Sequence, residues 1–164
     1  MNNLTLIIPA KYESESLPTV LDEIKSYNCK KKVILEPSDT ETIESIKNFD
    51  CEIIFQSQKG YGNALRMGIE SVDTDYLCIF NADGSFDPSY LPSMLKLCDN
   101  HDYVFATRYL KEAGSDDDTF LTKFGNYFFS TLGNILFSLK LSDILFTFVL
   151  GKKSSFKSLN LKCN

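Results

Sequence analysis

The stretch Asp75-Tyr-Leu-Cys-Ile-Phe-Asn-Ala-Asp-Gly84 joins a short apolar run to a polar turn. An apolar run of this length between polar residues is typical of a strand buried on both faces of a sheet. Asn81 and Asp83 follow it at alternate positions, so both project from the same side of the chain. We therefore expect a core strand that delivers an amide and a carboxylate to the edge of the sheet.

Similar runs on either side of this stretch alternate with helical patterns. We expect further strands at 4–9, 32–35, 51–55 and 103–107, and helices at 16–27, 40–49, 63–72 and 88–97, the first capped by Ser16. This alternation predicts an α/β fold with a mainly parallel sheet flanked by helices. Beyond Arg108 we expect a polar loop at 111–119, a long aromatic-rich helix at 120–139, a strand at 142–150 and a short element at 154–161.

Composition excludes several classes of function. The 164 residues suit one domain, and the net charge of -5 without a basic cluster argues against nucleic-acid binding. The five cysteines show no CxxC spacing, which favours reduced thiols in a cytoplasmic protein. The single histidine, His101, leaves little material for a Ser-His-Asp or Cys-His hydrolase. We expect no signal peptide and no membrane span.

The strand ends carry the candidate chemistry, because ligands of open parallel sheets bind beyond the carboxyl ends of the strands. These ends are Pro9–Glu13, Glu36–Asp39, Gln56–Gly60, Asn81–Asp83 and Arg108. The oxygens of Asp83 and Asn81 suit Mg²⁺ or Mn²⁺, with Ala82 and Gly84 leaving the approach open. The alternative for Asp83-Gly84 is an ordinary turn, and the residues alone do not decide between the two.

Five segments together resemble family-2 glycosyltransferases of GT-A fold, especially the dolichyl- and polyprenyl-phosphate sugar synthases. They are Ile7-Ile-Pro-Ala-Lys-Tyr-Glu13, Lys59-Gly-Tyr-Gly-Asn-Ala-Leu-Arg66, Phe80-Asn-Ala-Asp-Gly-Ser-Phe-Asp-Pro88, Ala106-Thr-Arg-Tyr109 and Leu141-Ser-Asp-Ile-Leu-Phe-Thr-Phe148. The chain departs from the family where Asn81 replaces the first Asp of the DxD motif. It also departs where Lys11-Tyr12 replaces Tyr-Asn, Glu36-Pro-Ser replaces Asp-Asp-Gly, and Phe146-Thr-Phe replaces a Thr/Ser-Gly-Phe pattern.

The resemblance implies a role for each candidate residue. Glu13 and Glu36 would bind the base and ribose of a nucleotide-diphosphate sugar, in a pocket completed by Pro9, Ala10 and Ala82. Asp83, assisted by Asn81, would hold Mg²⁺ or Mn²⁺ on the diphosphate. Arg108 and Lys123 would neutralise the diphosphate or an acceptor phosphate. Asp143 would act as base or acceptor-positioning acid, with a turn residue as the alternative.

The implied activity is inverting transfer of a sugar to a polyprenyl phosphate or a cell-surface glycan precursor, in cell-envelope biogenesis. Residues 1–109 would form the nucleotide-sugar-binding part and residues 110–164 the acceptor-side part of one domain that continues further in relatives. A core or dimer face explains the apolar stripe of helix 120–139 most simply, and contact with the inner face of a membrane is the alternative. The rival functions are a non-catalytic nucleotide-sugar-binding domain and, less favoured because residues 11–15 are acidic, a nucleotidyltransferase.

Overall fold

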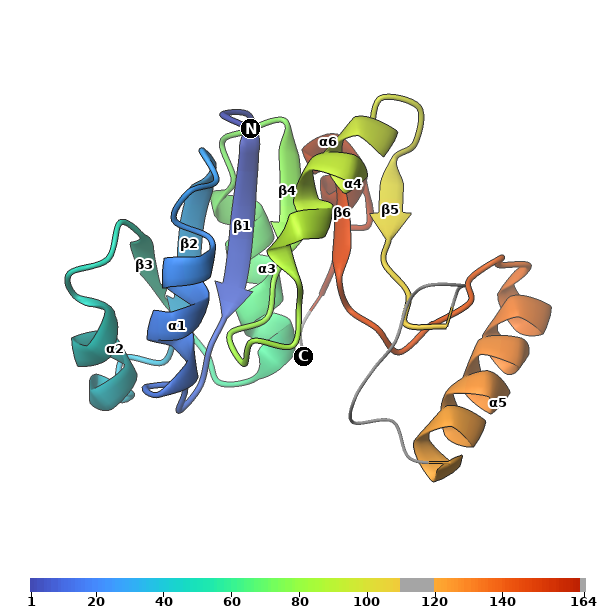
Figure 1. Cartoon of the computed structure of the whole chain (residues 1–164), viewed down its shortest axis with the longest axis horizontal. Coiled ribbons are helices and arrows are strands. Elements are labelled where there is room, and N and C mark those ends of the chain that lie inside the picture. Colours follow the sequence, from blue (N-terminus) through green and yellow to red (C-terminus); the bar gives the residue numbers. More distant parts are fainter. Residues whose placement is uncertain (110–119, 163–164) are drawn as a thin grey trace. The chain divides into compact units, whose positions relative to one another are not determined.

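The computed structural model describes residues 1–109 and 120–162, with side chains described for all of these except 120–123. Strands and helices alternate along the first hundred residues (Figure 1). The elements are β1 (Leu4–Pro9), α1 (Ser16–Glu23), β2 (Lys30–Leu35), α2 (Thr40–Ile46), β3 (Glu52–Phe55), α3 (Tyr61–Ser71), β4 (Tyr76–Ile79), the 3-10 turn η1 (Pro88–Tyr90), α4 (Leu91–Leu97), β5 (Tyr103–Phe105), α5 (Phe120–Phe137), β6 (Val149–Lys152) and α6 (Lys153–Ser158).

The strands form one six-stranded sheet in the order β3-β2-β1-β4-β6-β5. β1 pairs in parallel with β2 on one side and with β4 on the other, and β2 pairs in parallel with β3. β6 lies antiparallel to β4. The predicted α/β class with a mainly parallel sheet is therefore confirmed.

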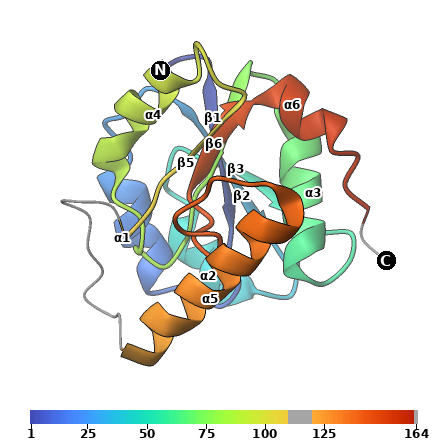
Figure 2. The same cartoon turned by 90° about the vertical axis from the view of Figure 1, so that its right-hand side faces the viewer.

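The central strand β1 is buried on both faces, as its unbroken apolar run predicts. Leu4, Leu6, Ile7 and Ile8 are all fully buried, because α1 and α4 cover one face of the sheet and α3 and α6 cover the other (Figure 2). The approach of α3 to β1 is close. A Cβ at Gly68 would lie 2.3 Å from Ile7 Cγ2, so this helix position requires glycine.

One hydrophobic cluster fills the space between the sheet and the α3–α6 layer. It combines side chains of β1, β2, β4 and β6 with those of the two helices: Ile7, Ile34, Ala64, Ile69, Val72, Leu77, Ile79, Val149 and Phe156. Because the cluster spans four strands, it fixes their relative positions and with them the loops that follow each strand.

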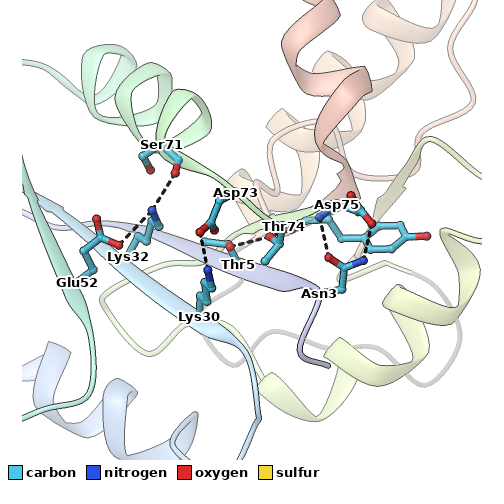
Figure 3. A network of polar contacts seen from close by, with 10 residues as sticks. Asn3, Thr5, Lys30, Lys32, Glu52, Ser71, Asp73, Thr74 and Asp75 are labelled. Atoms are coloured by element: carbon cyan, nitrogen blue, oxygen red, sulfur yellow. Dashed lines mark hydrogen bonds and ion pairs between the residues drawn. The ribbon is translucent and has the colours of Figure 1, made fainter.

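A polar network ties together the amino-terminal side of the sheet (Figure 3). Lys30 pairs with Asp73 at 2.5 Å, and the hydroxyls of Thr5 and Thr74 lie 2.7 Å apart. Lys32, almost fully buried, donates to the Ser71 carbonyl oxygen at 2.8 Å and pairs with Glu52 at 3.1 Å. These contacts link β1 and β2 to β3 and the loop before β4, so their role is structural.

The structure differs from the predicted elements at several ends, three of which have a local explanation. No side chain caps α1, which begins at Ser16, and the Ser16 hydroxyl instead donates to Glu13 at 2.5 Å. The predicted helix at 88–97 begins as the 3-10 turn η1, capped by Asp87, before α4. Most of the strand predicted at 142–150 is wrong, because β6 occupies only Val149–Lys152.

The chain divides into two compact units. The first comprises residues 1–104 and 149–164, and holds β1–β4, β6 and the helices that pack on them. The second comprises residues 105–148 and contains α5. Within it, side chains of α5 bond the backbone at the start of the segment predicted as a strand and just before it: Ser130 accepts from the Ile144 amide, and Asn134 bonds both backbone groups of Leu141 at 2.8 and 3.0 Å.

Candidate functional site

The carboxyl ends of three adjacent parallel strands meet at one edge of the first unit. Ala10 donates to the Ile34 carbonyl oxygen at 3.0 Å, and Phe80 donates to the Ile7 carbonyl oxygen at 2.9 Å, so pairing continues to the strand ends. The loops that follow β1, β2 and β4 therefore open together. The strand order reverses direction along the chain between β1 and β4, the place where α/β sheets bind ligands. The structure thus brings Glu13, Glu36 and Asp83 to the same edge.

Asp83 lies in the exposed turn after β4, in which Gly84 adopts a φ of +80°. Its Oδ1 accepts from the Ser85 amide at 2.9 Å, and Asn81 Nδ2 donates to the Ser85 hydroxyl at 3.1 Å. The turn thereby orients both side chains through their contacts with one residue. Ala82 between them is buried, so it anchors the turn to the core.

The second carboxylate, Glu36, is buried directly after β2. Its side chain is 7% exposed and pairs with Lys11 at 3.0 Å from the end of β1. The hydrogen bond to this carboxylate raises the pKa of the Lys11 ammonium above its ordinary value. The sequence indicated the acid but not its partner, because the pairing of residues at two strand ends leaves no local pattern.

Residues at the start of helix α2 hold the loop after β1 in place through hydrogen bonds. Asp39, 4% exposed, accepts from the Tyr12 amide at 2.7 Å and caps α2 through the Thr42 amide. Thr42 in turn accepts from the Glu13 amide at 3.0 Å. Sequence reasoning placed Asp39 at a strand end but gave it no role, and it missed Thr42, although Ser-Asp-Thr before a helical pattern is a typical N-cap signal. Half-buried Pro9, the last residue of β1, and buried Ala10 lead into this loop.

The side chains after β4 fit a hard divalent cation as part of its coordination shell. Asp83 Oδ2 and Asn81 Oδ1 are oxygen atoms of the kind that such an ion prefers, and neither makes a hydrogen bond within the described residues. No group of three or more His, Cys, Asp or Glu side chains in the described ranges could hold a metal alone. The residues present therefore match an ion such as Mg²⁺, which takes one or two protein oxygens and completes its shell with substrate phosphates and water.

In the second unit, the structure joins two residues that the sequence placed in separate roles. Arg108 donates through Nε to Asp143 Oδ2 at 2.8 Å and through Nη2 to Oδ1 at 3.2 Å. The Asp143 side chain is fully buried, whereas Arg108 keeps 26% exposure. The guanidinium also lies 5.0 Å from the Phe146 ring centroid. Lys123 lies in α5, and its side chain falls outside the described residues.

Within its own unit, helix α5 buries small and polar side chains and exposes large apolar ones, which is the reverse of the usual pattern. Its small and polar residues Asn126, Ser130 and Gly133 are buried, and a Cβ at Gly133 would lie 2.5 Å from Ile144 Cδ1. Its large apolar residues are exposed: Phe124, Tyr127, Phe128, Phe129, Leu132, Ile135, Leu136 and Phe137. None of the helices described has the length and hydropathy needed to cross a membrane.

Comparison with proteins of known sequence gives one family. The model of "Glycosyl transferase family 2" matches residues 5–159. An uncharacterized glycosyltransferase of Mycobacterium tuberculosis is 28% identical over 92 residues, which are 56% of this chain and 42% of that protein. A protein of the same description from Mycobacterium bovis matches equally. The chain thus spans less than half the length of these relatives.

Comparison with solved structures gives the same fold. Mannosyl-3-phosphoglycerate synthase from Rubrobacter xylanophilus superposes with a TM-score of 0.73 at 15% identity, over 94% of this chain and 54% of that one. Glucosyl-3-phosphoglycerate synthase from Mycobacterium tuberculosis, solved with Mn²⁺, UDP and phosphoglyceric acid, superposes with a TM-score of 0.74 at 12% identity, over 93% and 56%. At these identities the likeness shows the fold, which is that of nucleotide-diphospho-sugar transferases. The extent of the family match identifies the chain as a member of glycosyl transferase family 2.

Proposed function

We propose that this chain is the nucleotide-sugar-binding part of a metal-dependent, inverting glycosyltransferase. The observation that carries the proposal is that the loops bearing Glu13, Glu36 and Asp83 follow three adjacent parallel strands, at the edge where α/β sheets bind ligands. The structural relative solved with Mn²⁺ and UDP supports the same assignment of ligand class.

The edge of the first unit would bind the donor. Glu13 and Glu36 accept hydrogen bonds from the base and ribose, and Pro9, Ala10 and Ala82 wall the pocket. Asp83 and Asn81 hold Mg²⁺ or Mn²⁺, which when bound supplies positive charge to the diphosphate. Since the ion takes only two ligands from these residues, its binding depends on the diphosphate itself.

The second unit would serve the leaving group and the acceptor. Arg108 offers a planar fork of donors that suits a phosphate, and we assign Lys123 to the same charge-neutralising role. Asp143 was a candidate base, but its carboxylate is fully buried and bonded twice by Arg108. We therefore propose that Asp143 positions Arg108. A polyprenyl phosphate acceptor is already anionic, so transfer to it needs no base.

The exposed apolar face of α5 supports a lipid-linked acceptor over a soluble one. The helix and the residues up to Ser142 contain Lys123 and Lys140 but no acid, in a chain with a net charge of -5. Such a segment suits the anionic inner surface of a membrane. Flotation with anionic vesicles tests this: Ile135→Glu should lower the bound fraction, whereas Phe55→Glu, at an exposed apolar position of β3, should not. If Ile135→Glu binds as wild type and instead abolishes a dimer, the face is a protein interface.

The decisive assay for transfer is release of nucleotide from UDP-, GDP- and dTDP-sugars with and without Mn²⁺. Asp83→Ala should abolish the metal-dependent release. Asp87→Ala is the matched control, because Asp87 is also exposed and also accepts a backbone amide in the same loop. Metal-dependent turnover that survives in Asp83→Ala would rule out the metal assignment.

A second candidate is a non-catalytic nucleotide-sugar-binding domain. Asn81 favours it, because this amide removes one negative charge from the position where the family has the first Asp of its DxD motif. Calorimetry distinguishes the two functions. Tight nucleotide binding without turnover on lipid-phosphate or glycan acceptors, and without gain of turnover in Asn81→Asp, would establish the binding domain.

A further inference from the structure

The first unit contains a pocket of about 410 Å³ at the amino end of β4. Its walls are the residues that begin β4 and those where β6 passes into α6: Asp75, Tyr76, Lys152, Lys153, Ser154 and Lys157. β6 runs antiparallel to β4, so Lys152 at the end of β6 lies beside Tyr76 at the start of β4. Asp83 follows the opposite end of β4, beyond Ile79. The pocket is therefore separate from the proposed donor edge.

The backbone around the pocket is held in place by regular contacts. The Lys153 amide donates to the Asp75 carbonyl oxygen at 2.8 Å, and the Lys152 amide donates to the Asp102 carbonyl oxygen at 3.0 Å. Phe156, 5% exposed, anchors α6 in the hydrophobic cluster between the sheet and its helices. The side chains that line the pocket are thus presented by elements that are fixed to the core.

The positive charges of the pocket are only partly balanced. Lys152 pairs with Asp102 at 3.0 Å. Lys153 and Lys157 make no ion pair or side-chain hydrogen bond with any other described residue. Since these two lysines lie four positions apart on α6, their ammonium groups share a face of the helix and repel each other. In a chain with a net charge of -5, this local excess of positive charge indicates a site for an anion.

A carboxylate and two hydroxyl groups also line the pocket. Asp75 Oδ2 accepts from Asn3 at 2.6 Å (Figure 3), whereas Asp75 Oδ1 has no hydrogen bond within the described residues. The hydroxyl groups of Ser154 and Tyr76 have none within those residues either. A carboxylate accepts hydrogen bonds from hydroxyls but repels a phosphate. The pocket therefore suits a ligand that carries a phosphate at one end and neutral hydroxyls at the other.

We propose that this pocket is a second ligand site, which binds a small phosphate monoester with hydroxyl groups, such as a sugar phosphate. Lys153 and Lys157 bind the phosphate, each as a compact charge with several donors. Asp75 accepts hydrogen bonds from the hydroxyls of the ligand, and the half-buried Tyr76 contributes to the wall. The volume of about 410 Å³ lies in the range of small-molecule pockets. The inference is independent of the proposed function, because none of these residues belongs to the donor edge.

Calorimetry in EDTA tests the site, because chelation removes the divalent ion that the donor edge is proposed to hold. The probes are glucose 6-phosphate, inorganic phosphate and glucose. We expect glucose 6-phosphate to bind more tightly than inorganic phosphate, and glucose not to bind at millimolar concentration. Lys153→Gln and Lys157→Gln should each lower the affinity for glucose 6-phosphate by about 3- to 10-fold, the effect of losing one partly exposed charged contact.

Lys96→Gln is the matched control and should bind as wild type. Lys96 is also an exposed lysine in the last turn of a short helix, without an ion pair in the part of the chain that the structure describes. Asp75→Asn should narrow the difference in affinity between glucose 6-phosphate and inorganic phosphate, since it removes the charge that faces the hydroxyls.

Two results would overturn the inference. The first is equal affinity of wild type, Lys153→Gln and Lys157→Gln for glucose 6-phosphate, which would mean that this probe binds elsewhere. The second is failure of wild type to bind either phosphate probe at millimolar concentration, because the two lysines are assigned to the phosphate whatever group it carries. Neither result bears on the proposed function, which is tested with nucleotide and metal.

Discussion

Replacing Asp143 with asparagine tests whether this acid positions Arg108 or acts as a base. The substitution keeps the shape of the side chain but removes the charge that balances the guanidinium. Breaking a buried ion pair by neutralising one partner costs about 3–5 kcal/mol. Arg108 keeps 26% exposure, so water can solvate part of its charge, and asparagine still offers one acceptor. We therefore expect Asp143→Asn to lower the free energy of unfolding by about 1.5–3 kcal/mol.

A double-mutant cycle in urea isolates the pair itself. Arg108→Met leaves the fully buried Asp143 carboxylate without its two guanidinium bonds and should cost a similar amount. The double variant Arg108→Met/Asp143→Asn should lose less than the sum of the two single losses, by at least about 1 kcal/mol. Additive losses would refute the reasoning, because they would mean that the two side chains do not interact in solution.

Turnover of the same variants separates the two roles of Asp143. A positioning residue lowers kcat through a less ordered Arg108 and leaves the shape of the pH–rate profile unchanged. A general base contributes the acid limb of that profile, so Asp143→Asn would flatten it. A flattened profile would instead assign Asp143 the role of base that the family resemblance implies.

Three further predictions concern the first unit. Gly68→Ala should destabilise the protein by about 1–3 kcal/mol in urea, since its Cβ would overlap Ile7, despite the better helix propensity of alanine. Asp39→Ala should lower the free energy of unfolding by about 1–3 kcal/mol in the same assay, because it leaves the Thr42 and Tyr12 amides without their acceptor; a loss below about 0.5 kcal/mol would contradict this role of Asp39. Burial raises the pKa of the Cys78 thiol well above its ordinary value, so the thiol stays protonated in the folded state at a pH where it ionises in the unfolded state. The free energy of unfolding should therefore fall as the pH rises above about 9. In Cys78→Ala this fall should be less steep.

The sequence predicted the sheet of the first unit well because its signals are local. The apolar run at Leu4–Pro9 matches β1 at both ends, and the runs at 32–35 and 51–55 fall on β2 and β3. The polar residues after each run then had to share one edge, since parallel strands end on the same side. This is why it was predictable that the loops bearing Glu13, Glu36 and Asp83 would follow adjacent strands at one edge of the sheet.

The failed strand at 142–148 shows where local signals end. Ile144 lies inside the predicted strand and Leu141 just before it, but their backbone groups are bonded by the α5 side chains of Ser130 and Asn134. Nothing in the sequence around Ser130 and Asn134 indicates that these helix residues would bond backbone groups that a neighbouring strand would otherwise bond. The pairings of Lys11 with Glu36 and of Arg108 with Asp143 were hidden for the same reason: each joins side chains 25 or more positions apart.

In the first unit, the two ends of the strands around β1 differ in how fully their polar side chains are paired. At the amino-terminal side of the sheet, Lys30 pairs with Asp73 and Lys32 pairs with Glu52 (Figure 3). These charges are therefore balanced by structural contacts. At the carboxyl side, Asp83 uses one carboxylate oxygen for its turn, and its other oxygen has no hydrogen bond within the described residues. A fold that needed only stability would pair both edges alike. We therefore expect a ligand at the edge that has an available acceptor, an exposed Tyr12 side chain and a buried carboxylate at Glu36.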